Sequence, residues 1–120
     1  MSHSSRYDPL FRAIDAKRTD QFLQFLSDDA TFRYANFPPA EGRAAIAEAV
    51  DQFFSSIESS RHEIRMVLEQ PHTAVCQGDV HYVRRDGRTL TLPFCNVFQL
   101  RDDKIARYEI YIDPAPLFAA

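Results

Sequence analysis

The sequence contains no tryptophan, only three glycines and only two cysteines among its 120 residues. Two cysteines are too few for the disulfide framework of a small secreted domain, and nothing in their spacing suggests a metal cluster. Cys76 and Cys95 are therefore predicted to be reduced thiols. No apolar run approaches the roughly 20 residues that a membrane-spanning helix needs, and the start of the chain lacks the apolar centre of a signal peptide. We expect a cytoplasmic protein.

Positive charge is not concentrated anywhere along the chain. The 14 Lys and Arg residues are scattered, and 17 Asp and Glu residues give a formal net charge of −3. The absence of a basic stripe argues against nucleic acid as a partner. A hydrophobic content of 45% and a charged content of 26% are ordinary for a globular domain. No linker, repeat or low-complexity tract divides the sequence, so residues 1–120 are expected to form a single domain.

Hydrophobic periodicity predicts an α+β fold. Apolar residues at helical spacing predict helices over residues 7–14, over a short segment that begins with Thr19 as N-cap, and over residues 42–56. Residues 30–36 alternate as a strand that ends before Pro38 and Pro39, because proline cannot donate to a strand ladder. From about residue 61 to residue 113 the period is two, which indicates an antiparallel meander. We expect three helices packed on one face of this sheet.

The Asp86-Gly87 pair predicts the register of the central hairpin. A two-residue type I′ turn there places Arg85 opposite Arg88. Directly opposed residues share a face, and the even-numbered residues from 90 to 100 are mostly apolar. The core face of the preceding strand is then expected to carry Gln77, Asp79 and His81, with Gln77 opposite Asn96. Pro93 lies on the outward parity and marks the place where a bulge would shift this register.

The next hairpin is predicted from the apolar pattern alone. The pattern favours Phe98 beside Tyr108, Asn96 near Ile110 and Phe94 near Ile112, with a three-residue turn and a bulge. Tyr111 then points outward among charged residues, which suggests a partly covered surface and a homodimer. Both cysteines have outward parity as diagonal neighbours, about 7–8 Å apart, which is too far for a relaxed disulfide.

Polar side chains interrupt the predicted core face, and this is the main indication of a site. They are His62, Gln77, Asp79, His81 and Asn96 on the meander, and Tyr34 and Asn36 on the earlier strand. A buried polar group without a partner costs roughly 1–3 kcal/mol. Several such groups on one face predict a lined cavity rather than a filled core.

The order of the elements and four motifs resemble the SnoaL-like domains of the nuclear transport factor two-like superfamily. The motifs are residues 34–38 (YANFP), 41–46 (EGRAAI), 92–98 (LPFCNVF) and 104–113 (KIARYEIYID). The resemblance covers essentially the whole chain. It implies a strongly curved, mixed but mainly antiparallel sheet wrapped on helices, with a pocket in the cone. Homodimers are frequent in this superfamily, so the resemblance also implies a homodimer. Members include ketosteroid isomerases, limonene epoxide hydrolases, polyketide cyclases, dehydratases and non-catalytic binding or dimerisation modules.

Residue-by-residue comparison with two of these families gives incomplete catalytic sets. Tyr34 and Asn36 match the water-positioning Tyr-x-Asn of the limonene epoxide hydrolases, and Asp79 matches one catalytic aspartate. Gln77 and Ile110 stand where that family has an arginine and a second aspartate, so epoxide hydrolysis is the less favoured activity. Asn96 aligns with the protonated aspartate of the ketosteroid isomerases, but no carboxylate near Tyr34 matches their general base. Asp113 resembles an acid/base aspartate of the cyclases.

The predicted catalytic residues are Asp79, Asn96 and Tyr34. A carboxylate on an apolar face suits proton abstraction beside a carbonyl, the Asn96 amide could hold a developing oxyanion, and Tyr34 could donate to a ligand. Predicted binding residues are Asn36, Gln77, His81, His62, Phe94, Phe98, Tyr108, Ile110, Ile112 and Phe54, with Asp113 as a further acid/base candidate by resemblance. No metal and no cofactor is expected.

Structural roles for the same residues remain open alternatives. Asp79 could be paired with His81, an arginine or backbone donors, and Asn96 could be satisfied by Gln77. His62 and His81 could be bonded core residues, and Asp113 could cap the C-terminal turn. Two functions follow. The first is a cofactor-independent isomerase, cyclase or dehydratase acting on a small apolar carbonyl or cyclic compound, and the second is a non-catalytic ligand-binding or dimerisation module.

Overall fold

The computed structural model describes residues 5–119. The other residues of the predicted 1–120 domain, including the first part of the start segment on which the signal-peptide expectation rests, lie outside the described residues. The elements follow in the order α1 (Asp8–Asp15), α2 (Thr19–Leu23), β1 (Leu26–Tyr34), β2 (Ala40–Glu41), α3 (Arg43–Ser56), β3 (Ile57–Gln70), β4 (Thr73–Arg84), β5 (Thr89–Arg101), β6 (Lys104–Ile112) and α4 (Ala115–Phe118).

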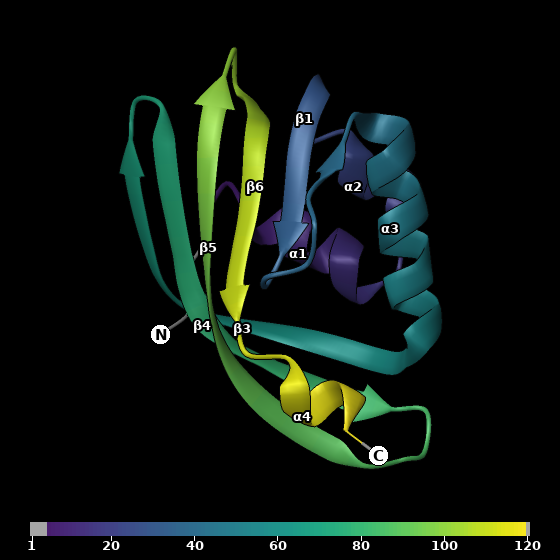
Figure 1. Cartoon of the computed structure of the whole chain (residues 1–120). Coiled ribbons are helices and arrows are strands. Elements are labelled where there is room, and N and C mark those ends of the chain that lie inside the picture. Colours follow the sequence, from purple (N-terminus) through teal and green to yellow (C-terminus); the bar gives the residue numbers. More distant parts are fainter. Residues whose placement is uncertain (1–4, 120) are drawn as a thin grey trace.

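The architecture is a curved sheet with helices on one side (Figure 1). The strand order is β2-β1-β6-β5-β4-β3, and only the pairing of β1 with β6 is parallel. The sheet is therefore mixed and mainly antiparallel, which confirms the predicted fold class. We call the face toward the helices the inner face and the opposite one the outer face. Among residues 5–119 no helix is long and apolar enough to cross a membrane.

The helices agree closely with the periodicity, and one short helix was not predicted. α1 buries Leu10, Phe11 and Ala13, and α3 buries Ile46, Val50 and Phe54. Thr19 is the first residue inside α2 rather than its N-cap, because Arg18 occupies the cap position. The additional helix, α4, lies beyond the end of β6, next to the bent ends of β4 and β5 (Figure 1).

The hairpin between β4 and β5 differs from the prediction by one residue. The N–H of Arg84 donates to the carbonyl of Arg88 at 2.8 Å, so residues 85–87 form a three-residue loop. Gly87 takes a φ of 88°, the left-handed conformation that closes such a loop with a bulge. The predicted two-residue turn was wrong. A shift of one residue moves every side chain of a strand to the other face.

This shift reverses the faces that were predicted for β4. Gln77 pairs with Cys95, Asp79 with Pro93 and His81 with Thr91, all on the outer face. Cys76, Val80 and Tyr82 instead lie on the inner face and are buried. Both cysteines are free, as predicted. The predicted outward position of Cys76 was wrong, because it is buried while Cys95 is on the outer face.

A bulge in β3 moves two further apolar residues outward. The register of β3 against β4 shifts between Ile64 and Met66. His62 and Ile64 keep the predicted inner position, but Met66 and Leu68 are exposed on the outer face. Gly78 lies opposite Ile64 at this bulge, and a Cβ added to Gly78 would lie 2.0 Å from the carbonyl oxygen of Glu63. The close approach of the two backbones requires glycine at this position.

The β5–β6 hairpin confirms the register that the apolar pattern predicted. Phe98 pairs with Tyr108, Asn96 with Ile110 and Phe94 with Ile112. The connection has two residues rather than three. Asp102 and Asp103 have φ values of 53° and 64°, and the extra residue, Ala106 of β6, forms a bulge opposite Gln99 and Leu100. Inner and outer positions of β5 and β6 are therefore as expected.

Candidate functional site

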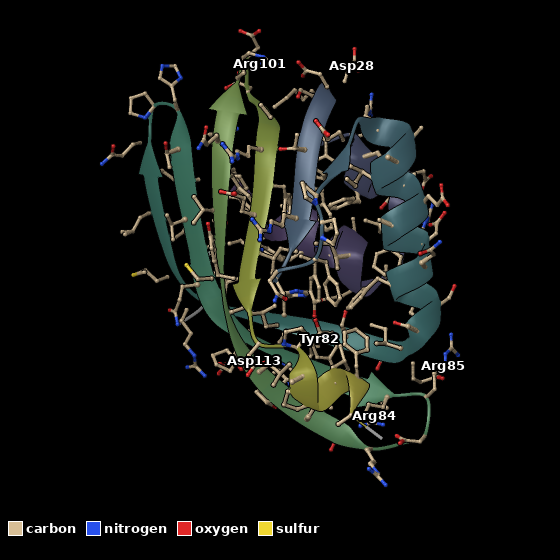
Figure 2. The ribbon with its side chains drawn as sticks, in the orientation of Figure 1. Asp28, Tyr82, Arg84, Arg85, Arg101 and Asp113 are labelled. Carbon is tan, nitrogen blue, oxygen red and sulfur yellow. The ribbon has the colours of Figure 1, made fainter. Side chains whose placement is uncertain are left out.

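A cavity of about 370 Å³ lies between the inner face of the sheet and the helices. Its volume falls within the range of about 300–1,000 Å³ that is common for small-molecule sites. Figure 2 shows Tyr82 of β4 between the bent sheet and α4. The wall is mainly aromatic and aliphatic, and it is formed by Ile14, Phe22, Phe32, Tyr34, Phe37, Pro38, Ala40, Ala49, Val50, Gln52, Phe53, Phe54, Ser56, His62, Val80, Tyr82, Phe94, Asn96, Tyr108, Ile110, Ile112 and Phe118.

His62 on β3 and Asp15 at the end of α1 form a hydrogen-bonded pair at this wall. The imidazole Nδ1 lies 2.6 Å from Asp15 Oδ1. The backbone N–H of His62 donates to the second carboxylate oxygen at 2.8 Å, and the Ser60 hydroxyl donates to the first at 2.9 Å. Phe11 and Phe94 flank the imidazole ring, with centroids 5.1 and 5.3 Å away. Both its position and its orientation are therefore fixed.

The pair determines which imidazole nitrogen is available. An ionised carboxylate only accepts hydrogen bonds, so the nitrogen facing Asp15 carries the proton. In the neutral ring the lone pair is then on Nε2. No hydrogen bond from a residue within 5–119 reaches this atom. A base whose second nitrogen is held by a carboxylate is the arrangement that general-base catalysis uses.

Two tyrosine hydroxyls meet at the same cavity. Tyr34 Oη of β1 and Tyr82 Oη of β4 lie 3.4 Å apart. Burial raises the pKa of Tyr34, and the hydrogen bond with Tyr82 partly offsets that rise. Burial, together with Tyr34 itself, raises the pKa of Tyr82 further. Both groups stay protonated across the physiological pH range, so the pair can donate a hydrogen bond to a ligand oxygen.

Asn96 is the buried polar residue of the wall. It is 2% exposed on β5, and its Nδ2 donates to Tyr108 Oη at 3.5 Å, the long limit of such a bond. Its Oδ1 has no hydrogen-bond partner. Gln77, the predicted partner, lies on the outer face, so that alternative was wrong. An unsatisfied buried acceptor costs about 1–3 kcal/mol, and this cost calls for an explanation.

Aromatic residues from two segments border the opening of the cavity. Phe37, in the loop after β1, and Phe118 of α4 are 47% and 49% exposed, and their ring centroids are 6.4 Å apart. Phe37 also stacks on Tyr34 at 6.1 Å. Arg84 holds α4 by donating to the carbonyl of Pro116 at 3.3 Å. Phe37 and Phe118 therefore give one side of the opening an apolar border, while the exposed Gln52 and Ser56 also line the cavity.

Eight of the residues predicted for the site do line the cavity. They are Tyr34, Phe54, His62, Phe94, Asn96, Tyr108, Ile110 and Ile112. Their predicted inner position is confirmed, whereas their roles toward a ligand stay predictions.

Three predicted site residues lie on the outer face instead. Asp79 forms a salt bridge with Arg65. His81 bonds Thr91 Oγ1 through Nδ1 at 2.8 Å and Glu63 Oε1 through Nε2 at 3.0 Å. With Gln77, they form cross-strand contacts on the surface of the sheet. Their predicted position in the cavity was wrong because of the one-residue shift in the hairpin.

Asn36, Asp113 and Phe98 also lie away from the cavity. Asn36 and Asp113 border a separate hollow near the end of β6, and Figure 2 places Asp113 beside α4. The Asp113 carboxylate accepts a hydrogen bond from the N–H of Ala115 at 3.1 Å, which is the capping role considered for it. Phe98 is fully buried in the core, where it packs against Tyr108.

The sequence interpretation missed Asp15 and Tyr82. Asp15 stands four residues after Phe11, on the edge of the apolar stripe of the first helix, so a polar residue on an apolar helical face was the available signal. Tyr82 alternates with Val80 and Cys76, and this apolar set of β4 already marked the true inner face. Among residues 5–119, no three His, Cys, Asp or Glu side chains are grouped to hold a metal ion.

The sequence profile of the SnoaL-like domain matches residues 8–108. The chain therefore belongs to the SnoaL-like domain family. A search of curated proteins finds no significant match. The identified family agrees with the fold, since the curved mixed sheet and its covering helices are those expected of such a domain.

Solved structures support the same fold. An NTF2-like protein of unknown function from Burkholderia pseudomallei superposes with a TM-score of 0.86 at 16% identity, covering 93% of each chain. TerC, crystallised with polyporic acid, gives 0.80 at 20% identity over 90% of this chain and 88% of TerC. A putative polyketide cyclase from Xanthomonas campestris gives 0.78 at 24% identity, over 90% and 87%. At these identities the likeness extends to the fold alone.

Proposed function

We propose that the protein binds a small, largely apolar carbonyl compound in the cavity and catalyses acid–base chemistry on it without a cofactor. The observation that carries the proposal is the His62–Asp15 pair in the wall of an otherwise apolar cavity. TerC, which has a similar fold, was crystallised with polyporic acid, and this supports a small-molecule ligand for the present chain. Isomerisation, cyclisation and dehydration all begin with such a proton transfer.

The geometry supports a specific division of roles. His62 Nε2 takes a proton from the carbon next to the carbonyl, and Asp15 stabilises the imidazolium that forms. The C–H electron pair moves to form the carbon–carbon double bond, and the carbonyl π pair moves to the oxygen. The hydroxyls of Tyr34 and Tyr82 donate hydrogen bonds to this enolate oxygen. Return of the proton to another atom completes an isomerisation. His62 takes the role predicted for Asp79.

The test uses 2-tetralone, a bicyclic ketone of a size suited to the cavity. In D2O a base that removes a proton from its C1 position exchanges that hydrogen for deuterium, which NMR follows directly. We expect the protein to exchange it much faster than imidazole at equal concentration and pD. A rate equal to that of imidazole would contradict catalysis and would leave the alternative, a non-catalytic binding or dimerisation module.

The outer face of the sheet supports a homodimer as a further part of the proposal. Met66, Leu68 and Tyr111 are exposed there, and half-buried Val75, Cys95 and Val97 lie between them in register. Contiguous exposed apolar side chains rimmed by polar ones are typical of an interface. The free thiols are in keeping with the cytoplasmic location that we infer.

Two charges placed in this patch are expected to separate the subunits. For the wild type we expect twice the 13.8 kDa chain mass in sedimentation equilibrium. In the double variant Leu68→Glu, Tyr111→Glu, apposed carboxylates would lose hydration and repel each other, and we expect the monomer mass with an unchanged circular dichroism spectrum. A wild-type monomer, or a double variant that stays dimeric, would contradict this interface.

A further inference from the structure

The amide of Asn96 stands out within the part of the chain that the structure describes. Apart from the tyrosines, Asn96 is the one buried polar residue among residues 5–119, and its Oδ1 has no hydrogen-bond donor. The amide nitrogen makes a single long contact with Tyr108 Oη, at 3.5 Å. Buried polar atoms are nearly always paired in folded proteins. The contacts within the protein therefore do not explain why an amide stands at this position.

The residues that pair with Asn96 in the sheet offer its oxygen no partner. Its neighbours in register are Ile110 on β6 and Cys76 on β4, both inner-face residues without a strong donor. Phe94 and Phe98 lie two residues away on the same face of β5. A leucine of similar size would fill this position without leaving an acceptor unpaired. The unpaired oxygen is therefore unfavourable for the fold, and rotation of the amide toward the cavity would let a bound group satisfy it.

Asn96 lies at the deep end of the cavity. The adjoining wall residues Tyr108 and Phe22 are each 1% exposed, and burial raises the pKa of Tyr108, which stays protonated. Phe37 and Phe118, which border the opening, are about half exposed. A ligand that enters between them brings its leading end to Asn96. The amide can turn about its soft terminal torsion to face that end.

A second unpaired polar atom provides a useful contrast. Tyr7 Oη is also buried without a partner, but Tyr7 is not among the residues that line the cavity. It packs against Phe98, with ring centroids 5.3 Å apart. An unpaired polar atom alone therefore identifies no site. What distinguishes Asn96 is that its unpaired amide belongs to the wall of the cavity.

We propose that Asn96 determines ligand specificity by accepting, through Oδ1, a hydrogen bond from an O–H or N–H group at the leading end of the ligand. This inference rests on the proposed binding function and deepens it. The ligand class becomes a small apolar compound with a donor at the buried end, in addition to the carbonyl near Tyr34 and Tyr82. In this role Asn96 accepts a hydrogen bond through its oxygen, whereas the sequence suggested that its amide would hold an oxyanion.

The test compares ligands that differ only at one group. The probes are 2-naphthol, 2-methylnaphthalene and 2-methoxynaphthalene, which carry a hydroxyl, a methyl group of similar size, and an acceptor without a donor. The protein has no tryptophan, so no tryptophan emission overlaps the naphthalene fluorescence. We expect the wild type to bind 2-naphthol about tenfold more tightly than either of the other probes, because only the hydroxyl pairs the orphan oxygen.

Substitutions assign the preference to Asn96. In Asn96→Leu we expect the preference to fall to about twofold or less while 2-methylnaphthalene still binds; Asn96→Ala serves if the leucine variant does not fold. Tyr7→Phe, which removes the other buried unpaired polar atom, is expected to keep the wild-type preference.

Four results would overturn the inference. They are equal wild-type affinities for the hydroxyl and methyl probes, a preference that persists in Asn96→Leu, tighter binding of 2-methoxynaphthalene, which would mean that the amide NH2 group faces the ligand, and failure of all three probes to bind. The last result alone would also remove the proposed binding function. Selective binding of 2-naphthol by a protein that does not exchange 2-tetralone would leave the role of Asn96 standing and remove only the catalysis.

Discussion

Replacing His62 by glutamine is expected to lower the exchange of 2-tetralone about 10²–10⁴-fold, the usual contribution of a positioned general base. Glutamine is polar and of similar size, so it can still donate to Asp15, but it has no basic nitrogen. The loss should appear in the rate at saturating ketone, with little change in the ketone concentration needed for half the maximal rate. NMR of the C1 signal in D2O measures both quantities.

Matched controls separate this effect from damage to the fold. Asp15→Asn keeps the shape of the pair but removes the charge that supports the imidazolium, so we expect a smaller loss of the exchange rate. Asp79→Asn is expected to leave the rate unchanged, because Asp79 lies on the outer face in a salt bridge with Arg65. Full activity in His62→Gln, or loss of activity in Asp79→Asn, would contradict the site described here.

Gly78→Ala is expected to be the most destabilising single substitution in the sheet. The new Cβ would lie 2.0 Å from the carbonyl oxygen of Glu63 and 3.0 Å from the Cα of Ile64. Both are backbone atoms, so β3 and β4 must move apart at the bulge. We expect the free energy of unfolding to fall by at least about 3 kcal/mol, measured by urea denaturation.

Gly87→Ala provides the control for this prediction. Gly87 also requires glycine, but through its φ of 88° rather than through a close neighbour, and no atom lies within 4 Å of an added Cβ. Its cost should be limited to backbone strain, roughly 1–2 kcal/mol. If Gly78→Ala cost no more than Gly87→Ala, the bulge between β3 and β4 would not exist as described.

The β5–β6 part of the fold was predictable because its apolar pattern is nearly unbroken. On one strand the inward residues are Phe94, Asn96 and Phe98. On the next strand Tyr108 and Ile110 are also inward, so the pairing of the two strands followed from burial alone. Identification of the family also followed from the motifs. That residues 1–120 form one domain stays a prediction.

The β4 prediction failed because a turn motif was given more weight than the strand itself. Asp-Gly is compatible with both a two-residue and a three-residue loop, and the choice between them changes the face of every residue on β4. The apolar set of Cys76, Val80 and Tyr82 favoured the correct face. The pairing of His62 with Asp15 joins residues 47 positions apart, and no local pattern predicts such a contact.

Methyl NMR during titration with 2-naphthol tests the central claim most directly, namely that the ligand binds on the inner face of the sheet. The isoleucine methyl groups of Ile14, Ile110 and Ile112 line the cavity, whereas Met66 and Leu68 are exposed on the outer face. We predict that saturable shifts occur for the three isoleucines and are absent for Met66 and Leu68. Shifts confined to Met66 and Leu68 would contradict the account.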